Sequence, residues 1–267
     1  MNPNDADTLP RAIAMQYDRG EVVFAAGSQP VLREYSYSGS GLRVFGKSAD
    51  FLGDPRFQCA YAAGWSRMGK SAPHTDDARW IAHVAIWAAS QAALLDGDFV
   101  ECGVNTGLLS LAICEWLDFN RLDRDFWLFD TYDGIPDAQM SDAERQGIGS
   151  WHNRHSYQEC HAHTVESFAP WPRCRVTRGT VPDILTQFPL GRSVAYLSID
   201  MNIVLPEIAA LNFFWDRLVP GAMVLLDDYA WDTHRPQKDA FDAFARQRSH
   251  DPDLADRAGA AGALTGS

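Results

Sequence analysis

Short apolar runs alternate with stretches of helical periodicity from residue 76 to about residue 246. Each apolar run ends in or beside a polar or glycine-containing turn, and the stretches between the runs repeat apolar side chains every three or four positions. This alternation is typical of βαβ units, so it predicts an α/β, Rossmann-like doubly wound and mainly parallel sheet with helices on both faces. The predicted strands are 99–102, 126–129, 175–177, 194–199 and 222–226, and the predicted helices are 108–117, 182–187, 206–218 and 237–246.

The regions outside this alternation differ in composition. Residues 1–75 are rich in Gly, Ser and Pro, and we expect them to form an N-terminal helical cap on a domain that spans 76–248. Residues 80–94 repeat apolar side chains at helical spacing and predict the helix before the first strand. Residues 249–267 are charged and then Ala- and Gly-rich, so we predict a disordered tail, with the final strand pair of the sheet missing. The sheet edge left open would favour association into a homo-oligomer.

A long segment separates the second and third predicted strands. Residues 131–174 far exceed the usual βα connection of about 2 to 6 residues, which indicates an insertion that acts as a lid or recognises a substrate. Its aromatic and polar side chains suit the face and hydroxyls of a sugar, although an ordinary surface loop has the same composition. These side chains are Trp151, His152, Asn153, Arg154, His155 and Tyr157.

The charge balance narrows the class of partner. The chain has 35 acidic and 23 basic side chains, a formal net charge of -12, which argues against nucleic acid or an anionic membrane surface as partner. Its 5 cysteines form no CxxC pair and are expected to be reduced thiols. No apolar run approaches the roughly 18 residues of a membrane span, and residues 1–20 lack an apolar signal core. We therefore expect a cytoplasmic protein.

A glycine loop joins the first predicted strand to the helix after it. The loop reads Glu101-Cys102-Gly103-Val104-Asn105-Thr106-Gly107. Glycines at such a turn let a ligand approach the backbone, and the following helix presents free N–H groups. The spacing differs from the GxGxxG of dinucleotide enzymes and resembles the first motif of class I methyltransferases. Glu101, Gly103, Asn105, Thr106 and Gly107 are thus candidate S-adenosylmethionine-binding residues, and a merely structural glycine turn is the alternative.

Two later strand ends extend the candidate cofactor site. Asp130 follows the second strand, where an acid can accept hydrogen bonds from ribose hydroxyls, or else simply cap the turn that follows. Gly179 and Thr180 follow the third strand, where this fold contacts an adenine. A plain turn, with Thr180 capping the next helix, is an equal alternative there.

Three acids follow the fourth and fifth strands. Asp200 ends one strand, and Asp227 and Asp228 end the other. In a doubly wound sheet these ends are neighbours, and three converging carboxylates repel one another unless a cation neutralises them. Oxygen ligands of this kind suit Mg²⁺, so the pattern predicts a magnesium site, with Asn202 joining it or orienting a substrate. The alternative is a solvated pair of acids that caps a turn.

Taken together, four segments resemble the macrocin O-methyltransferase family of antibiotic sugar modification. They are Phe99-Val100-Glu101-Cys102-Gly103-Val104, Leu128-Phe129-Asp130-Thr131-Tyr132-Asp133-Gly134-Ile135-Pro136, Ile199-Asp200 and Leu225-Leu226-Asp227-Asp228-Tyr229. The resemblance, over about 76–244, implies Mg²⁺-dependent methylation of a hydroxyl on a sugar or related natural product. It implies metal ligands at Asp200, Asp227 and Asp228, and cofactor contacts at Glu101, Gly103 and Asp130.

The chain departs from that family at one functional position. The family's Asp-Gly-Asp is here Asp200-Met201-Asn202, and a neutral amide cannot be the general base. Asp200, Asn202 and Asp228 are the catalytic candidates, with His83 and the histidines of the insertion as other replacements for the base.

Two further readings compete with the methyltransferase. A protein that binds the cofactor without catalysis would follow from the lost base and strands. An NAD-linked oxidoreductase is disfavoured because the loop is not GxGxxG.

Overall fold

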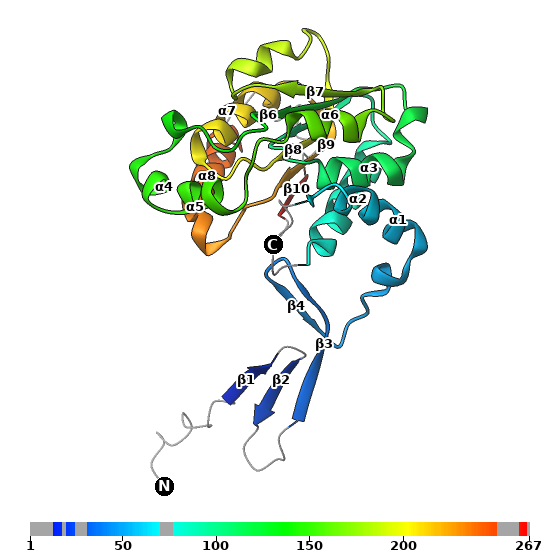
Figure 1. Cartoon of the computed structure of the whole chain (residues 1–267), viewed down its shortest axis with the longest axis vertical. Coiled ribbons are helices and arrows are strands. Elements are labelled where there is room, and N and C mark those ends of the chain that lie inside the picture. Colours follow the sequence, from blue (N-terminus) through cyan, green and yellow to red (C-terminus); the bar gives the residue numbers. More distant parts are fainter. Residues whose placement is uncertain (1–12, 18–19, 25–30, 70–76, 250–261, 266–267) are drawn as a thin grey trace.

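The fold is built on a parallel sheet of six strands in the order β10-β9-β8-β5-β6-β7 (Figure 1). The computed structural model describes residues 13–17, 20–24, 31–69, 77–249 and 262–265. Every pair of neighbouring strands runs parallel, which confirms the doubly wound architecture predicted from the alternation. The strands are β5 (Asp98–Cys102), β6 (Phe126–Asp130), β7 (Cys174–Arg178), β8 (Val194–Ile199), β9 (Leu218–Leu226) and β10 (Gly262–Thr265).

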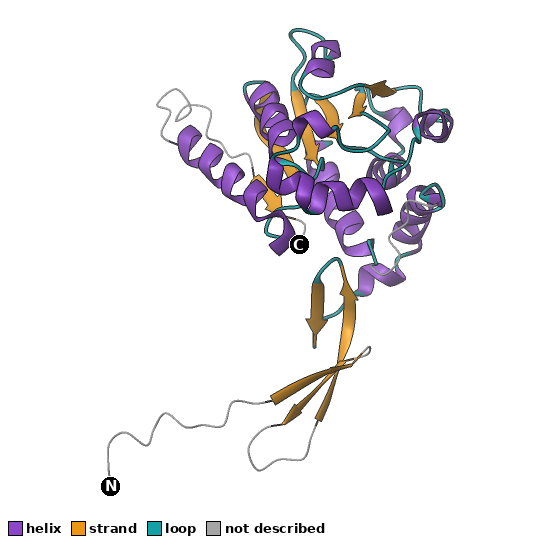
Figure 2. Cartoon of the chain, turned by 60° about the vertical axis from the view of Figure 1, so that its left-hand side comes forward, coloured by secondary structure: helices purple, strands orange, loops and turns teal. Residues whose placement is uncertain are grey.

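Helices cover both faces of the sheet (Figure 2). On one face α2 (Arg79–Ala92), α3 (Leu108–Leu117) and α6 (His161–Phe168) pack on side chains such as Phe99 and Tyr196. On the other face α7 (Val204–Trp215), α8 (Arg235–Ser249) and the 3-10 turn η6 (Asp183–Gln187) pack on side chains such as Val100 and Leu197. Because successive residues of a strand point to opposite faces, β5 and β8 are buried throughout.

Part of the region before residue 76 is an antiparallel sheet, so the prediction of a helical cap was incomplete. Its strands are β1 (Ile13–Tyr17), β2 (Gly20–Phe24), β3 (Val31–Gly39) and β4 (Leu42–Phe45), in that order. In β3, Tyr35 and Tyr37 alternate with exposed serines, a period of two that short polar residues obscure in the sequence. The buried Tyr37 hydroxyl donates to the Asp77 carbonyl and accepts from the Trp80 amide, so it fastens this sheet to the start of α2.

The helical part of the same region is α1 (Pro55–Trp65), which follows η2 (Asp50–Gly53). Asp54 caps α1 by accepting a hydrogen bond from the Arg56 amide, with proline in the first turn. The helix packs closely on α3, because a Cβ atom on Gly64 would lie 2.1 Å from the Leu108 carbonyl oxygen. It therefore supports α3 at the residue where the glycine loop ends.

The insertion between β6 and β7 is folded and helical. It contains η5 (Asp137–Gln139), α4 (Asp142–Gln146), α5 (Ile148–His155) and then α6. Ser141 and Glu144 form a capping box at the start of α4. Glu144 also accepts a hydrogen bond from the Val204 amide at the start of α7. This contact holds the insertion against the end of the sheet that carries the candidate site.

The C-terminal region differs from the prediction at 262–265. There β10 pairs in parallel with β9, with Gly262 opposite Met223 and Thr265 opposite Leu226. The predicted absence of any strand in the tail was thus wrong for these four residues, whose Gly- and Ala-containing sequence has low strand propensity. One parallel strand stands beside β9 among the described residues; the rest of the predicted disordered tail, 250–261 and 266–267, lies outside them.

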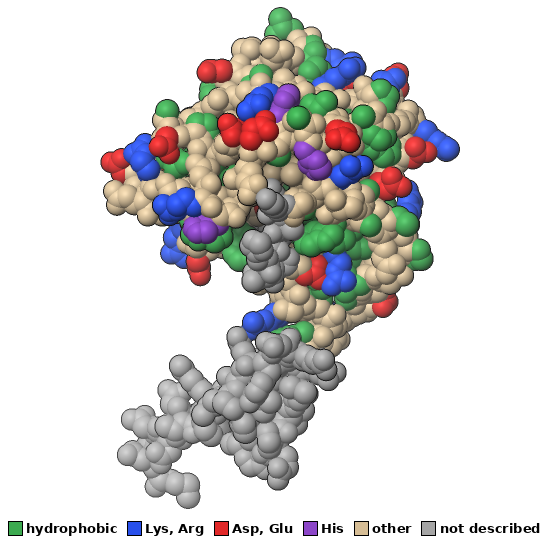
Figure 3. Space-filling model, in the orientation of Figure 1, with side chains coloured by type: hydrophobic (Ala, Val, Ile, Leu, Met, Phe, Trp, Pro, Cys, Tyr) green, Lys and Arg blue, Asp and Glu red, His purple; other side chains and the backbone are tan. Residues whose placement is uncertain are grey.

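The remaining short elements are η4 (Phe119–Arg121) and η7 (Asp232–His234). No helix in the described part of the chain has the length and apolar character needed to cross a membrane. On the face drawn in Figure 3, basic side chains are interspersed with acidic ones.

Candidate functional site

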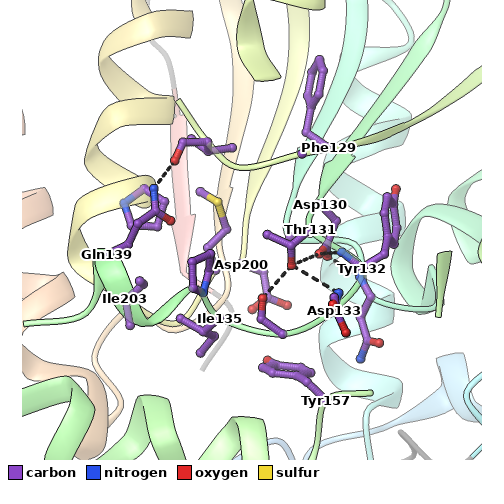
Figure 4. A pocket seen from close by; sticks show the side chains of 18 of the residues that line it. Phe129, Asp130, Thr131, Tyr132, Asp133, Ile135, Gln139, Tyr157, Asp200 and Ile203 are labelled. Carbon is purple, nitrogen blue, oxygen red and sulfur yellow. Dashed lines mark hydrogen bonds between the residues drawn. The ribbon is translucent and has the colours of Figure 1, made fainter. Parts of the chain in front are cut away.

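A cavity of about 710 Å³, measured with the open space at its mouth, lies at the carboxyl ends of β5, β6 and β8. Its walls come from the glycine loop, the turn after β6, the insertion and the loop after β8 (Figure 4). Four of the sequence-predicted cofactor residues line it, namely Gly103, Asn105, Asp130 and Gly179.

The backbone of the glycine loop requires glycine at its first turn. Gly103 has a φ of 88°, and a Cβ atom there would lie 1.7 Å from the Asp200 carbonyl oxygen. Gly107 has a φ of 89° and precedes α3, against the ring of Phe168. Thr106 is buried, with its hydroxyl 3.2 Å from the Met68 sulfur. Gly107, Thr106, Glu101 and Thr180 lie outside the cavity lining and can act only by shaping the loop or the turn near it.

Asp130 holds the glycine loop and the turn after β6 together through hydrogen bonds to backbone amides. Its Oδ2 accepts hydrogen bonds from the amides of Val104 and Asn105 at 2.6 and 2.7 Å, and its Oδ1 accepts from the Tyr132 amide at 2.6 Å. Asp130 therefore caps the turn after β6, as one of the two sequence hypotheses held. The same carboxylate also stands in the cavity wall, where a ligand hydroxyl can reach it (Figure 4).

Glu101 lies beneath the loop, 3% exposed, and its Oε2 has no hydrogen-bond partner among the described residues. Burial, together with the nearby carboxylates of Asp200 and Asp130, raises the pKa of Glu101 to about 8. A buried carboxyl with this pKa is mainly protonated at neutral pH. It can thus donate a hydrogen bond that an ionised carboxylate could not.

The three acids after β8 and β9 converge. One carboxylate oxygen from each of Asp200, Asp227 and Asp228 lies within 4.8 Å of those of the other two. Asp227 Oδ1 and Asp228 Oδ2 are buried without a partner among the described residues. Burial is the main cause that raises the pKa of all three, to about 7 for Asp200, and their mutual repulsion adds to it for Asp227 and Asp228. Such a set of hard oxygen donors with unpartnered atoms fits a divalent cation.

Asn202 is part of the scaffold of this acid cluster. It adopts a left-handed backbone conformation, with a φ of 64°. Its Nδ2 donates to Asp200 Oδ1 at 2.8 Å, and its Oδ1 accepts from the Tyr157 hydroxyl at 2.9 Å. The amide oxygen considered as a metal ligand is therefore engaged by the insertion. The amide as a whole orients one acid of the cluster.

Three further residues lie near the cluster, namely His152, Tyr157 and His234. The His234 Nδ1 lies 3.8 Å from Asp228 Oδ1. The His152 ring stacks on Tyr157, with centroids 5.3 Å apart, and lies 5.9 Å from the His234 ring. His152 and Tyr157 were noted in the sequence as insertion side chains, whereas nothing in the sequence pointed to His234.

Two other histidines considered in the sequence, His83 and His163, contact residues outside the cavity lining. His83 does not line the cavity, and its ring stacks on Phe51 at 4.2 Å within an aromatic cluster between η2 and α2. His163 makes a hydrogen bond with the Arg67 carbonyl.

Comparisons with known proteins show the family and the fold of the chain. A model of the family described as Macrocin-O-methyltransferase (TylF) matches residues 81–259. A solved structure titled as the O-methyltransferase NovP has a TM-score of 0.57 and 19% identity, covering 73% of this chain and 91% of that one. The likeness to NovP shows the methyltransferase fold.

Two further solved structures match less closely. CalS11, titled a calicheamicin methyltransferase, has a TM-score of 0.46 and 16% identity over 73% of this chain and 87% of that one. Its apo form, titled a TDP-rhamnose 3'-O-methyltransferase, has a TM-score of 0.42 and 16% identity over 74% and 86%. A search of curated proteins finds no match.

Proposed function

The chain belongs to the macrocin O-methyltransferase family and is an S-adenosylmethionine-dependent methyltransferase, and from this premise we propose that it methylates a hydroxyl of a saccharide-containing small molecule with the aid of a divalent cation. The observation that carries the proposal is the convergence of Asp200, Asp227 and Asp228 beside the cavity. Among the described residues, the basic group within 4 Å of these carboxylates is His234, whose pKa burial lowers, so the site is suited to a cation rather than to an anionic ligand.

The cofactor would occupy the cavity between the glycine loop and the turn after β6. When bound, S-adenosylmethionine supplies an electrophilic methyl group on its sulfonium sulfur. Gly103 lets its backbone approach, Asp130 would accept hydrogen bonds from the ribose hydroxyls, and Gly179 would face the adenine. The backbone amides of Val104 and Asn105 donate hydrogen bonds to the Asp130 carboxylate and keep it in place for that contact.

Asp200, Asp227 and Asp228 would hold Mg²⁺ or a similar cation. The bound cation supplies charge that orients and acidifies an acceptor hydroxyl. Asn202 keeps Asp200 turned to the cluster, and the His234 ring lies 3.8 Å from Asp228. The chain's own task at this edge of the sheet is thus to hold carboxylates together against their repulsion.

The insertion supports a saccharide as acceptor. On α5 the half-exposed Trp151 ring stacks on the His155 ring, with centroids 4.9 Å apart and planes 26° apart. The same helix carries His152 towards Tyr157 and His234. An aromatic face next to hydrogen-bonding groups is suited to the apolar face and hydroxyls of a sugar ring.

A cofactor-binding protein with weak catalysis is the second candidate. Asn202 favours it, because an amide engaged on both sides cannot take a proton from an acceptor. The two candidates share cofactor binding and differ in methyl transfer at saturating cofactor and metal. The radiolabelled methyl group of S-adenosylmethionine, followed into a panel of glycosides, separates them.

The first experiment is calorimetric titration of S-adenosylmethionine and S-adenosylhomocysteine into metal-free protein, repeated with Mg²⁺. We expect saturable cofactor binding and a separate Mg²⁺ heat that Asp227→Asn loses. Asp183→Asn, an exposed acid in η6, is the matched control and should keep both. A folded protein that binds no cofactor would contradict the proposed site, and a Mg²⁺ heat that survives in Asp227→Asn would contradict the metal ligands.

A further inference from the structure

His152 is a half-buried imidazole whose two ring nitrogens have no hydrogen-bond partner in the described part of the chain. Both nitrogens are shielded from solvent, although the ring is polar and able to form two hydrogen bonds. An unmade hydrogen bond of this kind costs about 1 to 3 kcal/mol, so native proteins rarely leave one without a reason. A ligand that bonds to the ring would supply that reason.

His152 does not itself line the cavity, and two neighbouring rings connect it to the acid cluster. On one side its ring stacks on Tyr157 with planes 20° apart, and Tyr157 donates to Asn202, which in turn donates to Asp200. On the other side it faces His234, which lies beside Asp228. One side chain, His234, thus separates His152 from Asp228, and two side chains, Tyr157 and Asn202, separate it from Asp200.

Two polar groups at the cluster cannot accept a proton from an acceptor hydroxyl. Asn202 is an amide. Burial, with the nearby carboxylates, raises the pKa of Tyr157 well above its ordinary value, so it remains a hydrogen-bond donor. The three clustered aspartates are occupied if they hold a cation. Two rings remain among the described residues against this face of the cluster. His234 has one nitrogen, Nε2, without a partner, and its Nδ1 is paired with the Thr233 hydroxyl, whereas both nitrogens of His152 lack a partner.

We propose that His152 is the group that accepts the proton of the acceptor hydroxyl, with Tyr157 and His234 as the positioning residues that hold its ring. This inference rests on the proposed function. The hydroxyl O–H bond breaks as an N–H bond forms on the imidazole, and the oxygen takes the methyl group that leaves the cofactor's sulfonium sulfur. The proton later passes from the imidazolium to solvent, so the ring returns to its neutral form.

The surroundings keep the ring ready for this task. Burial, with the nearby His234, lowers the pKa of His152 to about 4, so the ring is neutral at physiological pH, and it can keep a proton only while the ionised acceptor oxygen beside it raises that pKa. The titratable groups that face it are Tyr157, from the loop after α5, and His234, from η7. Neither is an acid that would hold a proton on the ring before the acceptor binds.

The test follows the proton of a bound hydroxyl. The probe is 4-nitrocatechol, which carries adjacent hydroxyls and absorbs at longer wavelength when ionised. It is titrated into the full chain, saturated with Mg²⁺ and S-adenosylhomocysteine, in two neutral buffers of different ionisation enthalpy. The variants are His152→Gln and the matched control His155→Gln, whose exposed ring lies on the same helix and bonds to the Trp151 carbonyl.

Wild type and His155→Gln should bind the ionised probe without releasing its proton to the buffer. His152→Gln should release that proton and bind the probe roughly tenfold more weakly, because a hydrogen bond to a charged group is lost. Equal proton release in all three proteins, or no binding of the probe by wild type, would overturn the proposal. Loss of the cofactor and Mg²⁺ heats, measured first, would instead count against the proposed function.

A second measurement on unmutated protein keeps the proposal testable if His152→Gln does not fold. In protein labelled with ¹⁵N-histidine, the His152 ring nitrogens should shift to the doubly protonated state when the probe binds. A ring that stays neutral with the ionised probe in place would overturn the proposal.

Discussion

The Asn202 side chain donates a hydrogen bond to Asp200 and accepts one from Tyr157, so a neutral amide joins the acid cluster to the insertion. An aspartate at position 202 would face Asp200 with a second carboxylate in place of a donor. The amide is thus compatible with three acids in a part-buried place, where a fourth charge would add to their repulsion.

Asn202→Asp tests this relationship. We expect the metal-free variant to lose about 1 to 3 kcal/mol of unfolding free energy, because a hydrogen bond becomes a repulsion. Mg²⁺ should restore part of the loss. Urea unfolding in EDTA and in Mg²⁺ measures both effects, with Asn212→Asp on the exposed part of α7 as control. Equal stability of wild type and Asn202→Asp in EDTA would refute the prediction.

Asp227→Asn should change stability in opposite directions with and without metal. In EDTA the variant should unfold at a higher temperature than wild type, since one of three mutually repelling carboxylates is gone. With Mg²⁺ at about 100 times its dissociation constant, wild type should gain roughly 2.7 kcal/mol that the variant lacks. Thermal unfolding followed by circular dichroism detects the reversal. A variant less stable than wild type in both conditions would show that Asp227 serves the fold rather than a cation.

Glu101→Gln should remove part of the pH dependence of stability. The pKa of Glu101 is raised from 4.5 to about 8 in the folded chain, so the folded state holds a proton that the unfolded state has lost between these values. Its contribution is therefore full below pH 4.5 and falls as pH rises towards 8, by at most about 1.4 kcal/mol per pH unit.

Urea unfolding from pH 5 to pH 8.5 should thus show a shallower decline for Glu101→Gln than for wild type. Glu166→Gln, an exposed acid on α6, should follow the wild-type curve. Parallel curves for wild type and Glu101→Gln would mean that Glu101 is ionised in the folded protein.

Gly103→Ala should abolish cofactor binding. The added methyl group would overlap the Asp200 carbonyl, and the backbone there has a positive φ, so the loop and the strand after it would have to move apart. Gly191→Ala is a matched control with a φ of 78° and no atom within 4 Å of the added carbon. It should cost only the backbone strain of about 1 to 2 kcal/mol and keep cofactor affinity. Calorimetry that finds equal affinity in both variants would exclude the loop from the cofactor site.

The five strands predicted in the sequence are all present, with ends within a few residues of those observed. The apolar runs of β5 and β8 and residues 222–226 of β9 are buried on both faces, and this property is local to each run, whereas β7 lies partly exposed at the edge of the sheet. The meeting of Asp200 with Asp227 and Asp228 was predictable for a related reason, because parallel strands that are neighbours end at the same edge. Sequence order and strand type were sufficient there.

Contacts made by the insertion were not predictable in the same way. That His152 meets His234, and Tyr157 meets Asn202, depends on how α5 packs over the sheet edge, and residues 45 to 82 positions apart carry no shared pattern. The sheet β1–β4 was not predicted, because the tyrosines of β3 alternate with serine and glycine rather than with a clear apolar and polar pattern. The pairing of β10 depends on the free edge of β9 rather than on its own sequence.

The close approach of Gly64 to Leu108 bears on where this protein can be cut. Phe57 and Ala60 of α1 are buried in the same core as α3, so a fragment that starts at residue 76 would carry the sheet but expose an apolar stripe of α3 to water. Such a fragment would be prone to aggregate, and its glycine loop would lose the support that α1 gives to α3. The autonomous folding unit therefore begins no later than Asp54, more than twenty residues before the first helix that the sequence made plain.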